Sequence, residues 1–243
     1  PQRHALRADF VSFMGHRPKT TPFLDSLAES GVVFTEAEAS CSWTTPSLAS
    51  LMTSLEPSAH GLVWPALDPV TGRQFSQTCL APSLVTLAET FHAGGWLTAG
   101  VPSNVHLRTG SGFDQGFDIY YGQAEFLGSD PLNKIVLAEM HNLPPPWRDH
   151  WQKRRAFLWV HYFDPHDPYR AREPWISDLV SRGARARLES IANLTMVGLR
   201  RMFPHPDSST ARILRPLYES EVRATDESLH ALCDSLDLLD DNA

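Results

Sequence analysis

Cysteine is scarce in this chain of 243 residues, which contains only Cys41, Cys79 and Cys233. Three thiols at such distant positions are too few for a disulfide framework or a cysteine zinc site. Long apolar runs are missing as well. No stretch approaches the roughly 18–20 apolar residues that a membrane helix needs, so we expect no membrane segment. The first residues show no signal-peptide pattern, and the compartment stays open.

A large excess of one charge is also absent, because 21 basic residues face 28 acidic ones and give a net charge of −7. The segment from Glu219 to the end holds eight acidic residues and one basic residue, so the remainder is balanced. We interpret this segment as the solvated face of one helix, with an interaction module as a weaker alternative. Without a dominant basic stripe, we expect no nucleic-acid partner.

The composition that remains is that of an ordinary globular protein, with 42% hydrophobic and 20% charged residues. Helical patterns alternate with short apolar runs, which is typical of an α/β domain with a parallel sheet. Helices are predicted to begin at Thr21-Pro22 and Thr44-Thr45-Pro46, and to cover Leu84–Ala93 and about Thr210 to Leu239. Strands are predicted at Val32–Thr35, Leu97–Val101 and Phe157–Phe163. Gly122–Trp147 is rich in Pro and Gly, and we expect a long surface connection there.

Thr44 is the first candidate for chemistry, because it stands at the start of a predicted helix. Backbone N–H groups and the positive end of the helix dipole converge there, so phosphate or sulfate binds well and a hydroxyl is stabilised as its alkoxide. From spacing alone, a plain helix cap is the better explanation of Thr44 and Thr45, because Thr-x-Pro caps are common.

Two further candidates follow predicted strands, where α/β proteins place their ligands. His166 lies in the turn-rich segment Asp164-Pro165-His166-Asp167-Pro168, where it could donate a proton to a leaving oxygen or bind an oxyanion. Asn104 and His106 follow the strand Leu97–Val101 and could hydrogen-bond an oxyanion. Each could also be a polar loop residue without a role.

The order of several segments makes the chain similar to a known family. The matching segments are Leu6–Asp9, Thr21–Phe34, Ser42–Leu51 with Thr53 and Pro57–Gly61, Gly95–Gly100, Gly116–Asp118, His161–Tyr169 and Tyr218–Leu236. Over nearly its whole length the chain resembles the sulfatase family of the alkaline-phosphatase superfamily.

The resemblance implies a doubly wound, mostly parallel sheet flanked by helices, and hydrolysis of sulfate or phosphate esters beside a divalent cation such as Ca, Mn, Mg or Zn. In sulfatases of type I the nucleophile is formylglycine, made from Cys or Ser in Cys/Ser-x-Pro-Ser-Arg. The matching residues here begin with Thr44 and end with Leu48. Thr44 cannot give the same aldehyde, and Cys41 lies three positions too early. A threonine nucleophile resembles that of the phosphodiesterase and phosphoglycerol-transferase branches, where the hydroxyl attacks phosphorus directly. This resemblance favours phosphoester chemistry.

The same resemblance points to missing metal ligands. The family's first metal-binding Asp matches His4, and Asp9 matches an acid of the motif that is not a ligand. The strand that precedes this motif, and the later strand with Asp-His-Gly, have no counterpart. Of the expected metal shell only Thr44 is present, and hard cations need several oxygen ligands. We therefore expect a single, incomplete sulfatase-like domain over residues 1–243, lacking strands at both ends.

Two functions remain open. In the first, the protein is a metal-dependent hydrolase in which Thr44 is the nucleophile and His166 the leaving-group acid or oxyanion donor. Asn104 and His106 then contact the oxyanion, and the substrate is a small-molecule, glycan or lipid-headgroup ester. In the second, the chain is catalytically inactive and at most binds an anion at the helix start of Thr44.

Overall fold

The computed structural model describes residues 6–63, 79–145, 147–153 and 155–239. The chain divides into two compact units, which are Ala37–Phe163 and the combination of Ala5–Glu36 with Asp164–Ala243. The expectation of a single sulfatase-like domain over residues 1–243 stays a prediction.

The first unit is built on a parallel sheet of three strands, in the order β2-β1-β3. Strand β1, Leu97–Pro102, pairs in parallel with β3, Ala156–His161, so that Leu97 lies opposite Ala156 and Pro102 opposite His161. Strand β2, Ile119–Tyr120, pairs with the other edge of β1. Every residue of β1 is buried, as expected for the central strand of a parallel sheet covered by helices.

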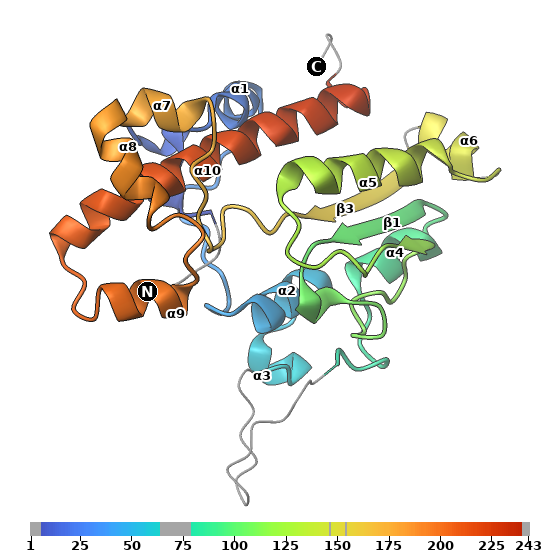
Figure 1. Cartoon of the computed structure of the whole chain (residues 1–243). Helices are drawn as coiled ribbons and strands as arrows, with labels where there is room; N and C mark the ends of the chain where they lie inside the picture. Colours follow the sequence, from blue (N-terminus) through green and yellow to red (C-terminus); the bar gives the residue numbers. More distant parts are fainter. Residues whose placement is uncertain (1–5, 64–78, 146, 154, 240–243) are drawn as a thin grey trace, which may run out of the picture. The chain divides into compact units, whose positions relative to one another are not determined.

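Helices flank these strands in the first unit. They are α2 (Thr44–Thr53), α3 (Pro57–His60), α4 (Leu87–Ala93), α5 (Ser129–His141) and α6 (Trp147–Gln152). Helices α4, α5 and α6 each contact β1, and α5 runs alongside the strands (Figure 1). A short 3-10 turn, Val105–Leu107, follows β1. The expected α/β class, with a parallel sheet flanked by helices, is confirmed.

The prediction of a surface connection over Gly122–Trp147 is wrong, because α5 occupies half of it. Leu132, Val136 and Met140 of α5 are buried, and they are spaced as one face of an amphipathic helix. Glycines and prolines flank the helix, and because these residues are typical of turns, the segment resembles a loop by composition. The third predicted helix begins later than expected, at Leu87, because Thr86 and Glu89 form a capping box there.

The second unit is helical in the described residues. Its helices are α1 (Pro22–Ser30), α7 (Trp175–Leu179), α8 (Arg182–Glu189), α9 (Met196–Met202) and α10 (Ser208–Ser235), with 3-10 turns at Ala8–Phe10 and Ser12–Met14. Ile176, Leu188, Ile191 and Leu217 form a buried cluster between α7, α8 and α10. None of the helices in the described part of the chain combines the length and the apolar character needed to cross a membrane.

Two predictions for the second unit are corrected. Val32–Thr35 is not a strand: the side chains of Val32 and Phe34 are exposed, and no neighbouring strand pairs with the segment. The acidic helix α10 is not merely a solvated face. Glu219, Glu221 and Asp226 are buried, each beside donors that other segments of the chain supply.

Candidate functional site

Thr44 is the first residue of α2, one position further into the helix than predicted. The N-cap residue, Trp43, provides no side-chain hydrogen bond, and Pro46 has no N–H. The N–H of Ser47 donates to the Trp43 carbonyl at 3.2 Å. Thr44 and Thr45 therefore carry the N–H groups that the helix itself does not satisfy, and these favour an anion or a developing alkoxide.

His60 contacts α2 through a side-chain hydrogen bond, and no role was predicted for it although Pro57–Gly61 is one of the segments that resemble the sulfatase family. The N–H of Leu62 donates to His60 Nδ1 at 3.0 Å, so the neutral ring carries its hydrogen on Nε2. Nε2 lies 3.1 Å from the hydroxyl of Ser50 on α2. Burial lowers the pKa of His60, which favours this neutral form.

Asn104 and His106 lie together in the turn that follows β1. The side chain of Asn104 is buried, and its Oδ1 accepts a hydrogen bond of 3.0 Å from the backbone N–H of His106. Burial, and secondarily the charge of Arg108, lower the pKa of His106. Leu107 belongs to the same buried cluster as Leu48 on α2, so the turn packs against the helix that begins at Thr44.

His166 belongs to the second unit, where its side chain is exposed. Its Nδ1 lies 2.8 Å from the carbonyl oxygen of Asp167 and 3.3 Å from the Asp167 carboxylate. A carbonyl oxygen only accepts hydrogen bonds, so Nδ1 is the nitrogen that carries a hydrogen and donates it. This orientation suits a general acid that acts through Nε2.

The two positions that match the acids of the family's first motif, neither of which was expected to bind a metal here, are only partly within the described chain. His4 lies outside the described residues, and Asp9 pairs with Arg7 at 2.7 Å. Within residues 6–63, 79–145, 147–153 and 155–239, no group of three His, Cys, Asp or Glu side chains could hold a metal ion. One hydroxyl, that of Thr44, does not suffice for a hard cation, so the donors described here do not fit the metal that the family uses.

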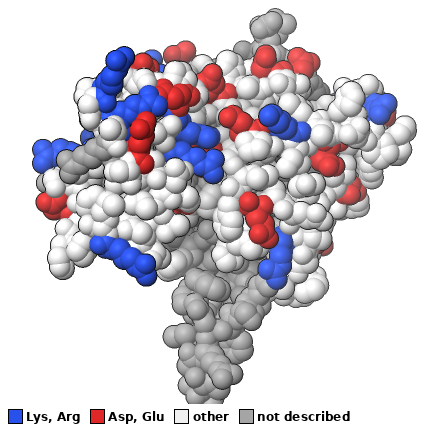
Figure 2. Space-filling view, in the orientation of Figure 1, with Lys and Arg blue, Asp and Glu red and all other residues white. Residues whose placement is uncertain are grey.

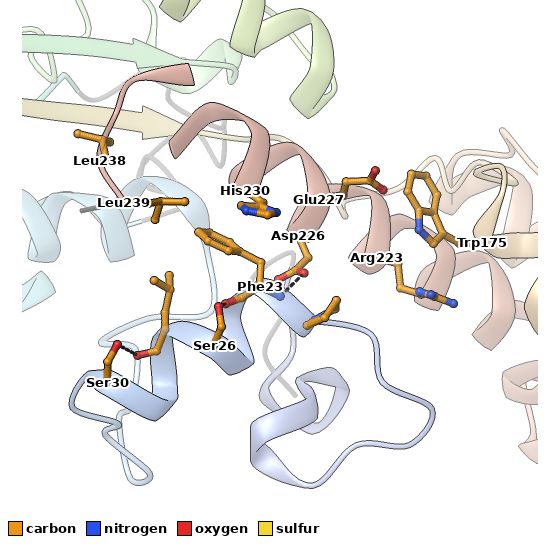
Figure 3. A pocket seen from close by; sticks show the side chains of 12 residues that line it. Phe23, Ser26, Ser30, Trp175, Arg223, Asp226, Glu227, His230, Leu238 and Leu239 are labelled. Atoms are coloured by element: carbon orange, nitrogen blue, oxygen red, sulfur yellow. Dashed lines mark hydrogen bonds between the residues drawn. The ribbon is translucent and has the colours of Figure 1, made fainter. Parts of the chain in front are cut away.

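A groove of about 660 Å³ in the second unit contains none of the predicted site residues. It lies between α1 and α10, where the rings of Phe23 and His230 stack at 4.6 Å (Figure 3). Two of its polar side chains bond within the protein: Asp226 accepts from the α1 backbone, and the Ser26 hydroxyl donates to the Phe23 carbonyl.

Basic and acidic side chains lie interspersed on the face drawn in Figure 2. Ion pairs among the described residues include Arg185 with Glu189 and Arg223 with Asp178. The absence of a nucleic-acid partner stays a prediction.

Comparisons with known proteins identify the family. The family model described as Sulfatase matches residues 5–243. Arylsulfatase A of Bos taurus is 41% identical over 96 residues, which are 40% of this chain and 18% of that protein. Arylsulfatase A of Homo sapiens is 38% identical over 96 residues, with the same coverage of 40% and 18%.

Solved structures share the fold at low identity. The phosphonate monoester hydrolase of Agrobacterium radiobacter has a TM-score of 0.64 and 16% identity over 98% of this chain and 58% of its own. A 2-O GAG sulfatase has a TM-score of 0.62 and 16% identity, covering 98% of this chain and 53% of its own. The periplasmic domain of EptC from Escherichia coli, in complex with Zn, has a TM-score of 0.58 and 16% identity over 96% and 57%.

The matched relatives are longer than this chain, which spans 18% of the two arylsulfatases and little more than half of the three structures. The family match nevertheless runs through both compact units, from the turns before α1 to the end of α10. The chain therefore belongs to the sulfatase family.

Proposed function

We propose that this chain supplies the nucleophile, the leaving-group acid and the oxyanion contacts of a metal-dependent hydrolase of phosphoric or sulfuric esters. The observation that carries the proposal is the position of Thr44. Its hydroxyl stands on the first residue of α2, beside backbone N–H groups that the helix leaves unsatisfied. The turn with Asn104 and His106 packs against the same helix.

The reaction that these residues support is a substitution at phosphorus. The Thr44 hydroxyl gives its proton to solvent water and forms a bond to phosphorus, while the bond between phosphorus and the leaving oxygen breaks. His166 would donate a proton from Nε2 to that oxygen, and water would then hydrolyse the phosphothreonine. Asn104 and His106 would hydrogen-bond the oxygens on which negative charge develops.

Phosphoesters are favoured over sulfate esters because of the nucleophile. Threonine carries a methyl group on Cβ and cannot become the formylglycine aldehyde of the sulfatases of type I. Its hydroxyl attacks phosphorus directly. The substrate would be a small-molecule, glycan or lipid-headgroup ester, and a divalent cation would be needed to stabilise the charge on its oxygens.

An assay with three aryl esters tests the proposal. An aryl phosphate, an aryl phosphodiester and an aryl sulfate are incubated with the purified chain, without metal and with added Mn²⁺, Zn²⁺, Mg²⁺ or Ca²⁺. Where the purified chain hydrolyses an ester, we expect the turnover to depend on the added metal, to be abolished by Thr44→Ala and to be retained in part by Thr44→Ser. Undiminished turnover by Thr44→Ala would remove Thr44 from the reaction.

One observation favours the second function, a sulfatase-fold chain that binds an anion without turning it over. It is the lack of a metal-binding side-chain group in the described residues. In that case no ester is hydrolysed with any metal, but inorganic phosphate or sulfate still binds at the start of α2. Isothermal titration with both anions, on the unchanged chain and on Thr44→Ala, separates this function from an inert fold.

A further inference from the structure

An ion pair joins the two ends of the segment that carries His166, residues 164–172. Asp164 precedes His166 and Arg172 follows it, and the Arg172 Nη2 atom lies 3.2 Å from Asp164 Oδ2. Both side chains are largely shielded, with 17% of Arg172 and 11% of Asp164 exposed. Shielded charges attract more strongly than surface charges, so this pair restrains the two ends of the segment.

Helix α10 holds the same segment from the other side. Its buried Glu221 accepts a hydrogen bond of 2.8 Å from the backbone N–H of Arg170. The neighbouring Ser220 accepts one of 3.3 Å from the N–H of Arg172. The far end of the His166 segment is therefore attached to the longest helix of the unit.

The guanidinium of Arg172 joins the two attachments. Its Nε lies 3.1 Å from Glu221 Oε2, while Nη2 faces Asp164. Neither Nε nor Oε2 has a hydrogen bond to another described residue, so these two buried atoms depend on each other. A guanidinium presents donors along two edges and can bridge two carboxylates, which the single ammonium of lysine does less well.

We propose that Arg172, held between Asp164 and Glu221, is a positioning residue that fixes the segment carrying His166. The role of His166 in ester hydrolysis comes from the proposed function, but the clamp formed by Asp164, Arg172 and Glu221 stands on the contacts alone. Because misplacing a proton donor by about 1 Å can cost a factor of about 100 in rate, such a clamp would matter for turnover.

The clamp would respond to pH near neutrality. Glu221 faces Arg172 and Asp164 through its side chain and Arg170 through the backbone N–H, with the Arg170 charge nearby. Burial raises the pKa of Glu221 to about 7, although the charge of Arg172 opposes the rise. Below this pH the carboxyl is neutral and attracts Arg172 less, so the His166 segment becomes better ordered as the pH rises through about 7.

Nitrogen NMR of the histidine rings tests the clamp without any substrate. The chain is labelled with ¹⁵N-histidine, and the His166 signals are assigned by their loss in His166→Gln. In the unchanged chain we expect the tautomer with the hydrogen on Nδ1, and a second inflection near pH 7 that comes from Glu221. Glu221→Gln should remove this inflection.

Three arginine variants complete the test. Arg172→Met should broaden the His166 signals and mix the two tautomers, and Arg172→Lys should restore them in part. Arg223→Met is the matched control, because Arg223 pairs with Asp178 and lies outside the clamp. Where the chain hydrolyses an ester, Arg172→Met should lower kcat about 10- to 100-fold with little change in KM.

Unchanged His166 signals in a folded Arg172→Met variant would overturn the proposal. If that variant does not fold, Asp164→Asn and Glu221→Gln decide instead, because they keep the side-chain shapes. With either of them, an unaltered His166 tautomer and pH profile would overturn the clamp. Failure of the proposed function is recognised separately, since it shows in the Thr44→Ala assay and leaves the histidine spectra unaffected.

Discussion

The carboxylate of Asp226 accepts a hydrogen bond of 2.8 Å from the backbone N–H of Phe23, which lies 203 residues earlier in the chain. The other carboxylate oxygen accepts one of 3.0 Å from Leu24 N (the first of these bonds is drawn in Figure 3). Thr21, the N-cap residue of α1, makes no side-chain capping hydrogen bond to the helix, and its hydroxyl instead accepts one of 2.9 Å from the backbone N–H of Ser12. Asp226 on α10 therefore caps α1 in place of a local residue, and its negative charge suits the helix N-terminus.

Replacing this distant cap should destabilise the second unit. Asp226→Ala leaves two buried N–H groups without their acceptor, and we expect a loss of about 2–3 kcal/mol in the free energy of unfolding. Urea titration followed by circular dichroism measures it. The control is Asp234→Ala, because Asp234 is exposed on the same helix. Equal effects of the two substitutions would contradict the capping role.

The raised pKa of Glu221 predicts how stability depends on pH. Burial moves the pKa from 4.5 to about 7, so between these values the folded chain holds a proton that the unfolded chain releases. The contribution of Glu221 to stability is thus fully present below pH 4.5 and is lost as the pH rises through about 7. A shift of this size corresponds to about 3 kcal/mol.

Unfolding free energies of the unchanged chain and Glu221→Gln, measured from about pH 5 to about pH 8, isolate this effect. The glutamine variant should lose less stability over the range. Glu227→Gln serves as the control, since Glu227 is exposed on the same helix and should keep the full pH dependence. Parallel curves for all three proteins would show that Glu221 does not titrate in this range.

Glycine at position 116, in the turn before β2, is required for close packing against Glu89 of α4. Gly116 has a φ of +83°, and a Cβ atom there would lie 2.6 Å from the Cα of Glu89. Gly116→Ala should therefore cost about 3 kcal/mol or more, because backbone has to move and the left-handed conformation is strained.

At Gly183, within α8, replacement by alanine is expected to stabilise the protein instead. A Cβ atom there meets nothing within 4 Å, and alanine favours helix. Gly183→Ala should raise the free energy of unfolding by up to about 1 kcal/mol. Thermal melts of both alanine variants measure the contrast, and a Gly116→Ala protein as stable as the unchanged chain would refute the packing argument.

Asn104→Ala tests the oxyanion contact separately from the nucleophile. Loss of one preorganised donor lowers kcat by roughly 100- to 1,000-fold in other hydrolases, and we expect a loss in this range for aryl phosphate hydrolysis. Asn142→Ala is the control, because Asn142 is an exposed residue at the end of α5. If the kcat of Asn104→Ala for aryl phosphate equals that of the control variant, Asn104 does not contact the oxyanion and only stabilises the turn after β1.

Local sequence patterns were sufficient where the determinants of structure are themselves local. Thr21-Pro22 and Thr44-Thr45-Pro46 mark the starts of α1 and α2 to within a residue. Proline is favoured in the first turn of a helix because its φ angle suits the helix and its missing N–H is not needed there, and neither reason depends on tertiary contacts. The sequence also predicted β1 and β3, because strands of a parallel sheet that is flanked by helices are rich in apolar residues. The sulfatase family was also recognised from local features, namely short motifs in a fixed order along the chain.

What the acidic residues of α10 do was decided only by tertiary structure. From the sequence, Glu219, Glu221 and Asp226 are predicted to lie on one solvated face of a helix. In the structure Arg215 of the same helix pairs with Glu219 at 3.0 Å, and the other partners, His16, Arg172 and the start of α1, come from distant segments. A carboxylate remains buried only where such donors offset its desolvation, and only the folded chain brings these donors together. The sequence alone thus determined the family, the main helices and strands and the candidate residues. Tertiary contacts decided which acidic side chains are buried and which donors they bind.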